Sequence, residues 1–113
     1  MLTIEKLRAF GADVDEALNR CMNNEAFYLR LVDKAMRDPA FDRLNEAVNA
    51  GDLDRAFEIA HALKGVMGNL SLTPLTKPIV EITELLRART PADYTPYLAE
   101  IQSRKNELME LLN

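Results

Sequence analysis

The sequence predicts an all-α fold, an antiparallel up-down four-helix bundle preceded by short additional N-terminal helices. Four stretches carry apolar residues at spacings of three and four, which is the period of an amphipathic helix. Short polar links separate these stretches, and short links favour antiparallel neighbours. No stretch shows the strand pattern of alternating polar and apolar residues flanked by turns. Because 113 residues are enough for one core, we expect a single domain over residues 1–113.

Two short helices are expected before the bundle. Thr3 and Asp13 are candidate N-caps, and Gly11 can close the first helix. The apolar positions of the two helices are Ile4, Leu7, Phe10, Val14, Ala17, Leu18 and Cys21. Asn23-Asn24 ends the second helix and offers the cap of the next one.

The first bundle helix should be bent or broken between Asn24 and Ala50. Asp38-Pro39 interrupts it, because the residue before a proline is pushed out of helical geometry. The expected apolar face comprises Phe27, Leu31 and Ala35, with Tyr28 and Val32 beside them, and then Phe41, Leu44, Ala47 and Val48.

The next helix contains His61, the only histidine of the chain, and is expected to run from an Asp52 cap to about Leu70. At about 100° per residue, its buried stripe comprises Ala56, Ala60, Leu63, Met67 and Leu70. The opposite side carries His61 together with Asp54, Glu58, Gly65 and Gly68, bordered by Phe57 and Lys64. This register predicts an imidazole that points to water.

Gly65 and Gly68 are unusual inside a helix, since each costs about 1 kcal/mol relative to alanine. On this side of the helix they remove bulk beside His61, which leaves a bare strip that another protein surface can approach. The other interpretation is that they allow close packing of a second helix of the same chain.

The last two helices follow the same period. Thr73 or Thr76 opens the first of them, Pro74 suits a first helical position, Pro78 is awkward unless the helix begins near Thr76, and Thr90-Pro91 ends it. Its apolar stripe comprises Leu75, Ile79, Ile82 and Leu86. The final helix carries Tyr94, Leu98, Ile101, Leu108 and Leu112, with Lys105 interrupting the apolar face.

Composition excludes several classes of function. A net charge of −4 argues against general nucleic-acid binding, which usually needs a basic face. No apolar run approaches the roughly 20 residues of a membrane span, and residues 1–6 lack the apolar core of a signal peptide. One histidine and one cysteine do not make a set of metal ligands. We therefore expect a cytoplasmic protein with neither a membrane partner nor a metal site. We also expect a monomer, because the bundle can bury its own core.

The stretch around His61 resembles the phosphorylation-site helix of histidine-containing phosphotransfer (Hpt) domains. The resemblance rests on Ala60-His61-Ala62-Leu63-Lys64-Gly65 with Gly68, on Gly51-Asp52 ahead of them, and on Val80-Glu81 and Arg87 in the next helix. It extends in pattern over about residues 11–87. Ser71, where many members have glycine, and Pro78 depart from the family pattern, and both concern local helix geometry.

The resemblance implies a phosphorelay intermediate. His61 would accept a phosphoryl group from a receiver-domain aspartate or a hybrid sensor kinase and pass it to the aspartate of another receiver. Lys64 would balance the phosphoryl charge, while Phe57, Glu58, Gly65 and Gly68 would contact the partner. The chain would need no cofactor, because the receiver would bring the Mg²⁺. It lacks a glycine-rich nucleotide loop, so we expect no autonomous kinase activity.

Two alternatives stay open. A non-catalytic helical adaptor or inhibitor would bind receiver or kinase domains through the same bundle without accepting phosphate. The dimerisation helix pair of a sensor kinase would carry a phosphoacceptor histidine, but usually with an acidic residue directly after it and a proline shortly beyond. Ala62 and Gly65 stand here instead.

Overall fold

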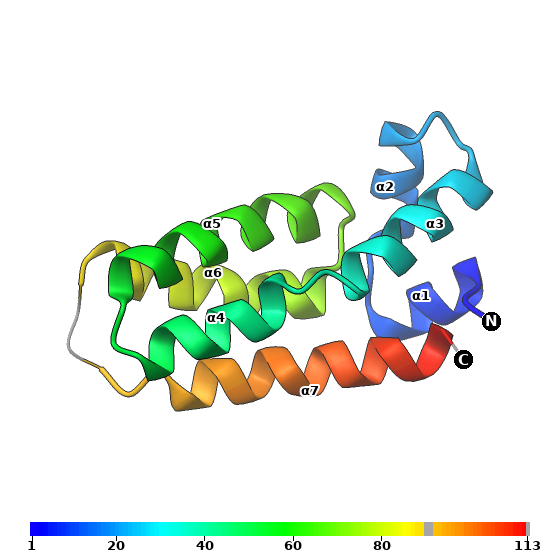
Figure 1. Cartoon of the computed structure of the whole chain (residues 1–113). Helices are drawn as coiled ribbons and strands as arrows, with labels where there is room; N and C mark the ends of the chain where they lie inside the picture. The colour runs from blue at the N-terminus through cyan, green and yellow to red at the C-terminus, as the bar shows by residue number, and fades with distance from the viewer. Residues whose placement is uncertain (90–91, 113) are drawn as a thin grey trace.

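The computed structural model describes residues 1–89 and 92–112, and all regular structure in these residues is α-helical (Figure 1). The helices are α1 (Ile4–Phe10), α2 (Val14–Arg20), α3 (Glu25–Met36), α4 (Ala40–Asn49), α5 (Leu53–Asn69), α6 (Thr73–Arg87) and α7 (Thr95–Leu112). They form an elongated body of 42 × 25 × 20 Å. The predicted all-α class is confirmed.

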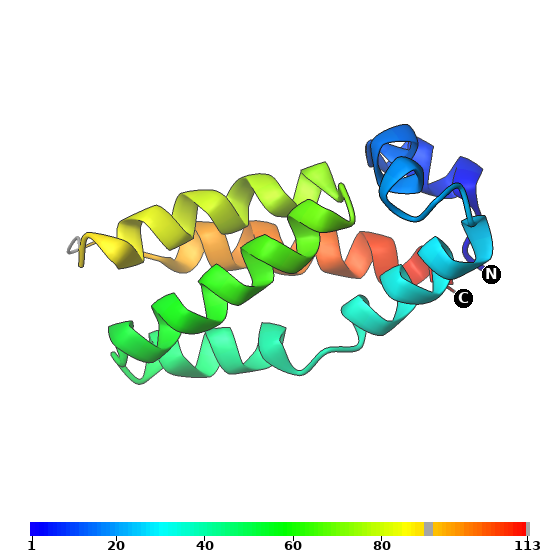
Figure 2. The ribbon, with the colours of Figure 1, turned by 90° about the horizontal axis from the view of Figure 1, so that it is seen from above.

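The four-helix bundle consists of α4 to α7, with α3 extending its first helix beyond a bend (Figures 1 and 2). Successive helices run in opposite directions; α5 packs against α4 and α6, and α6 packs against α7. The Lys105 ammonium on α7 lies 5.0 Å from the centroid of the Phe41 ring on α4. This cation–π contact explains how a lysine is accommodated in the apolar face of α7, and it ties the last helix to the first.

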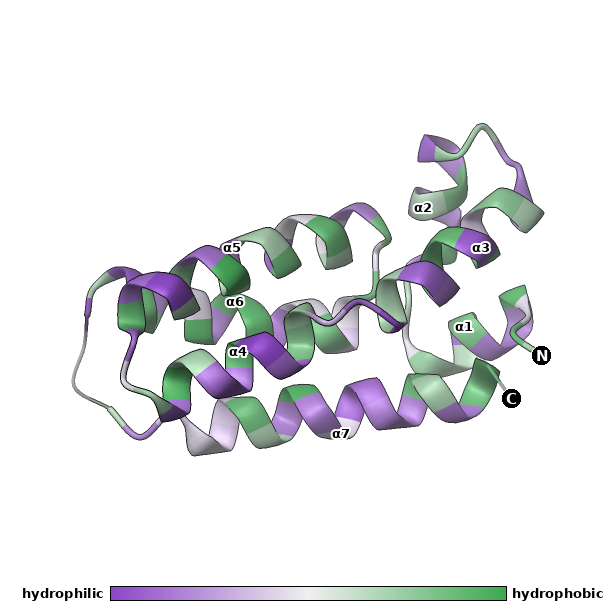
Figure 3. Cartoon of the chain, in the orientation of Figure 1, coloured by the Kyte–Doolittle hydropathy of each residue, from purple (hydrophilic) through white to green (hydrophobic). Residues whose placement is uncertain are grey.

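The core follows the predicted helical period most closely in the two central helices. The buried residues of α5 and its C-cap are Ala56, Ala60, Leu63, Met67 and Leu70, and those of the α6 stripe are Leu75, Ile79, Ile82 and Leu86. Hydrophobic and hydrophilic residues alternate around the bundle helices in Figure 3. Both predicted stripes are therefore confirmed.

The N-terminal helices start at the predicted caps. The side chains of Thr3, Asp13 and Asn24 accept hydrogen bonds from the backbone N–H groups of Lys6, Glu16 and Phe27, at 3.1, 3.2 and 3.0 Å respectively. Gly11 closes α1 with a φ of 110°, a left-handed conformation that glycine adopts without strain. The sequence thus specifies these boundaries through local capping chemistry.

The predicted break in the first bundle helix is confirmed, but the buried face of its first half is centred on Tyr28 and Val32 rather than on Phe27 and Leu31. α3 ends at Met36, and Pro39 precedes the first turn of α4. Phe27 remains 42% exposed, whereas Tyr28 and Val32 are fully buried. The buried residues of α3 are Tyr28, Val32, Ala35 and Met36, and the Tyr28 hydroxyl donates a 2.8 Å hydrogen bond to the Leu70 carbonyl at the end of α5.

α6 begins at Thr73, and Pro78 lies inside it as a buried residue. Pro78 has no N–H to donate to the carbonyl four residues before it, so the helix loses one internal hydrogen bond without ending. Of the two predicted starts, the structure has the earlier one. The predicted stop at Thr90-Pro91 lies outside the described residues, and α6 ends at Arg87.

The turn between α5 and α6 is held by the N-terminal helices. Arg20 of α2 donates through Nη1 to the Asn69 carbonyl and to the Ser71 hydroxyl, both at 2.9 Å, and pairs with Glu16. The Asp13 N–H donates to the Ser71 carbonyl at 2.9 Å. A guanidinium at the last carbonyls of a helix satisfies groups that lack a partner within the helix.

Ser71 adopts a φ of 54°, in the left-handed region that favours glycine. A serine in this conformation carries backbone strain that glycine would not. Here the serine hydroxyl gains a hydrogen bond from Arg20 and donates one to Glu16 at 3.2 Å. These side-chain bonds offset part of the backbone strain.

We predict that stability falls at alkaline pH through Tyr28. Burial raises the pKa of the Tyr28 phenol to about 12, above its ordinary value of about 10. Because the pKa is raised in the folded state, the contribution of this shift to the free energy of unfolding is fully present below pH 10. This contribution falls by about 2 kcal/mol as the pH rises towards 12. Tyr28→Phe should lose roughly 1–2 kcal/mol at pH 7, because the Leu70 carbonyl loses its donor, and should show a smaller alkaline loss.

Urea unfolding at pH 7 and between pH 9 and 12 measures both effects. Tyr97→Phe is the matched control, since among the described residues the Tyr97 hydroxyl forms no hydrogen bond. Equal alkaline losses in the wild type and in Tyr28→Phe would contradict the assignment.

Candidate functional site

His61 lies on the exposed face of α5, as its register predicts. Asp52 caps this helix by accepting the Arg55 N–H at 3.1 Å, and the helix continues unbroken through both internal glycines to Asn69. Because the apolar stripe faces the core, His61 and Glu58 are exposed on the opposite side together with Gly65. The exposure of the imidazole is therefore a consequence of the helical period.

The imidazole of His61 has one ring neighbour. Its centroid lies 5.7 Å from that of the Phe57 ring, with 23° between the ring planes. Within residues 1–89 and 92–112, neither ring nitrogen forms a hydrogen bond or an ion pair. Both nitrogens are thus available to a group brought by another molecule.

Gly65 and Gly68 do not serve packing within the chain. A Cβ atom added at either position would meet no atom of the described residues within 4 Å. The interpretation in which they admit a second helix of this chain is therefore wrong. Their effect is that no side chain protrudes from the helix at these two positions beside His61. The strip without protruding side chains extends over about two helical turns, roughly 10 Å at 1.5 Å per residue.

Lys64 is half-buried and follows His61 by three residues, a spacing that places two side chains on neighbouring parts of a helix surface. In the described part of the chain its ammonium forms no hydrogen bond or salt bridge. Glu58, three residues before His61, is exposed and likewise makes no such contact among these residues. One cation and one anion therefore flank the imidazole, and neither is paired with another described residue.

Phe57 is half-buried between two helices. The guanidinium carbon of Arg87 on α6 lies 5.0 Å from the centroid of its ring, and Arg87 also pairs with Glu84 at 3.4 Å. Sequence reasoning used Arg87 only as part of the family resemblance. Its contact with Phe57 depends on how α6 is rotated against α5, for which one sequence has no signal.

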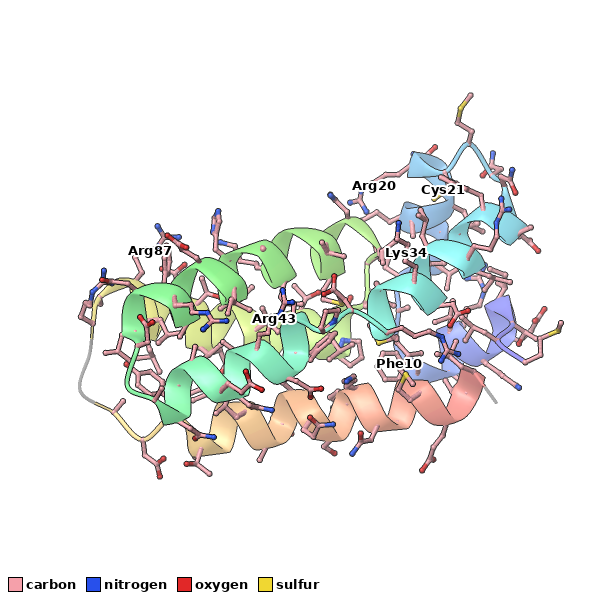
Figure 4. All side chains as sticks on the ribbon, in the orientation of Figure 1. Phe10, Arg20, Cys21, Lys34, Arg43 and Arg87 are labelled. Carbon is pink, nitrogen blue, oxygen red and sulfur yellow. The ribbon has the colours of Figure 1, made fainter. Side chains whose placement is uncertain are left out.

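Arginines lie near both ends of the exposed face of α5 (Figure 4). Near its start, Arg89 pairs with Asp54. Near its end, Arg20 lies 3.4 Å from the Gly68 carbonyl through Nη1 and retains about 44% of its side-chain exposure. Sequence reasoning missed Arg20, which reaches the site from α2. Both arginines are paired with a carboxylate, Arg89 with Asp54 and Arg20 with Glu16.

None of the helices in the described residues is long and apolar enough to cross a bilayer. The same residues contain no cluster of three or more His, Cys, Asp or Glu side chains arranged to hold a metal ion.

Comparison with protein families gives a match to the Hpt domain over residues 31–112, well over half of the chain. The chain belongs to the Hpt domain family. Hpt domains carry phosphoryl groups on histidine in two-component signalling, and they are carriers rather than kinases. No curated protein and no solved structure matches the chain.

The Hpt match includes all of α4 to α7 and the second half of α3. It leaves α1, α2 and the start of α3 outside. The helix that carries His61 therefore lies within the family region, whereas Arg20, Tyr28 and the other groups that hold the end of this helix lie before it.

We predict that Gly65→Ala and Gly68→Ala each raise the free energy of unfolding by about 0.5–1 kcal/mol. The new methyl groups enter open space, and alanine loses less backbone entropy in a helix than glycine. Gly51→Ala is the matched control, because Gly51 has a φ of 72° and the same change there should destabilise. Urea unfolding measures all three, and a loss of stability at Gly65 or Gly68 would restore a packing role.

Proposed function

We propose that this Hpt domain is a phosphorelay intermediate whose phosphoacceptor is His61. It would take a phosphoryl group from the aspartate of a receiver domain, free or within a hybrid sensor kinase, and pass it to a second receiver aspartate. The observation that carries this proposal is the exposure of the only histidine, with both nitrogens unbonded among the described residues, on a strip that two glycines keep low.

The chemistry follows from the nucleophilicity of the neutral imidazole. The unprotonated ring nitrogen donates its lone pair to phosphorus, and an N–P bond forms. The P–O bond to the partner aspartate breaks, and its electron pair leaves with the carboxylate. The proton on the other ring nitrogen can pass to solvent. Reversal of these steps on a second receiver returns the phosphoryl group to an aspartate.

This chain would supply position and charge balance for the transfer. Lys64 has an uncommitted ammonium near His61 that can approach the phosphoryl oxygens as a mobile point charge. Gly65 and Gly68 would let the edge of the receiver's acidic site come close, and Glu58 would border that contact. The receiver would bring the Mg²⁺ that neutralises its own carboxylates and the phosphate.

We predict that His61→Gln abolishes phosphoryl acceptance while the fold is retained. Glutamine keeps a polar side chain at an exposed helix position, so the free energy of unfolding should change by less than about 0.5 kcal/mol. The measurement is transfer of ³²P from phosphorylated receiver domains, followed by the stability of the labelled product. Wild-type label should be lost in acid and kept in base, as expected for phosphorus bonded to nitrogen.

Retention of label in His61→Gln would refute the site assignment. Binding of receivers by the wild type with no transfer of label would refute phosphotransfer and indicate a non-catalytic adaptor. Circular dichroism of both proteins controls for the fold.

A further inference from the structure

The orientation of the His61 ring depends on an aromatic contact. In an α-helix the Cα–Cβ bonds tilt towards the N-terminus, so the side chain of His61 leans over the turn that carries Phe57, four residues earlier. The ring centroids lie 5.7 Å apart with a 23° interplanar angle. Because no hydrogen bond to the described residues orients the imidazole, this stack is the contact that restricts its rotation.

Phe57 is itself held from the neighbouring helix. The Arg87 guanidinium lies 5.0 Å from the ring centroid of Phe57, within the range of a cation–π contact. Arg87 in turn pairs with Glu84 one turn earlier on α6. A continuous series of contacts therefore runs from α6 through Arg87 and Phe57 to the imidazole.

We propose that Phe57, held by Arg87, is a positioning residue for phosphoryl transfer: it selects one orientation of the His61 ring and so the nitrogen presented to the partner. This inference rests on the proposed function, and it assigns Phe57 a role within the chain in place of a direct contact with the partner. Ordering a ring in advance removes an entropic cost from the transfer step rather than from docking. Phe57 therefore acts on the rate within the complex.

Three variants test the role. Phe57→Leu removes the ring and keeps an apolar side chain, while Phe57→Tyr keeps the ring and is the conservative control. Arg87→Met removes the cation from an exposed side chain. It tests the series of contacts from Arg87 through Phe57 to His61 without changing Phe57. NMR of the unphosphorylated proteins reports the side-chain rotamers of His61, and ¹⁵N–³¹P couplings in the labelled proteins report which nitrogen carries phosphate.

Saturation kinetics with a phosphorylated receiver give the maximal transfer rate and the half-saturating concentration separately. Phe57→Leu should lower the maximal rate roughly two- to tenfold with an unchanged half-saturating concentration, average the His61 rotamers and give phosphate on both nitrogens. Phe57→Tyr should match the wild type, and Arg87→Met should fall between them.

The inference is overturned by averaged His61 rotamers in the wild type, or by a Phe57→Leu variant that is folded and unchanged in rotamers and rate. It is also overturned if Phe57→Leu raises only the half-saturating concentration, which would make Phe57 a docking contact. The rotamer measurement uses unphosphorylated protein. Absence of label in the wild type would therefore refute the proposed function, while the rotamer measurement would still test the role of Phe57.

Discussion

Burial of the apolar stripe of α5 is the constraint on which the site depends. The helix can place Ala60, Leu63 and Met67 in the core in only one rotational setting, and all three are at most 3% exposed. That setting carries His61 and the two internal glycines to the opposite face. Burial of the apolar stripe thus determines the direction in which the His61 side chain points, although this side chain makes no hydrogen bond in the described structure. A change that rotated α5 would remove the site even with every functional residue present.

The second constraint is the fixed end of this helix. Arg20, Tyr28 and Asp13 bond to the turn that follows α5, and all three precede the region matched to the Hpt family. The segment before that region therefore completes the site helix by satisfying its last carbonyl groups. It also places an arginine beside Gly68, at the far end of the strip from Arg87.

Local chemistry explains what could be read from the sequence. The caps at Thr3 and Asp13, the break before Pro39 and the register of α5 depend on residues within one or two turns of each other, so a single sequence contains them. The contact of the Tyr28 hydroxyl with the Leu70 carbonyl was missed because the two residues are 42 positions apart in the sequence. The setting of Phe57 against Arg87 was missed for the same reason. The exposure of His61 and the place of Phe57 beside it were predictable, whereas the contact of Arg87 with Phe57 was not.

The most direct test uses the fact that the chain has one histidine, so that modification by diethyl pyrocarbonate reports a single ring. The absorbance change at the carbethoxylated imidazole gives the rate in the free protein and in the presence of a saturating receiver domain with Mg²⁺. We expect rapid modification of the free protein, close to that of a small imidazole compound, and strong protection by the receiver. Slow modification of the free protein, or an unchanged rate with the receiver bound, would contradict an open His61 at the docking surface.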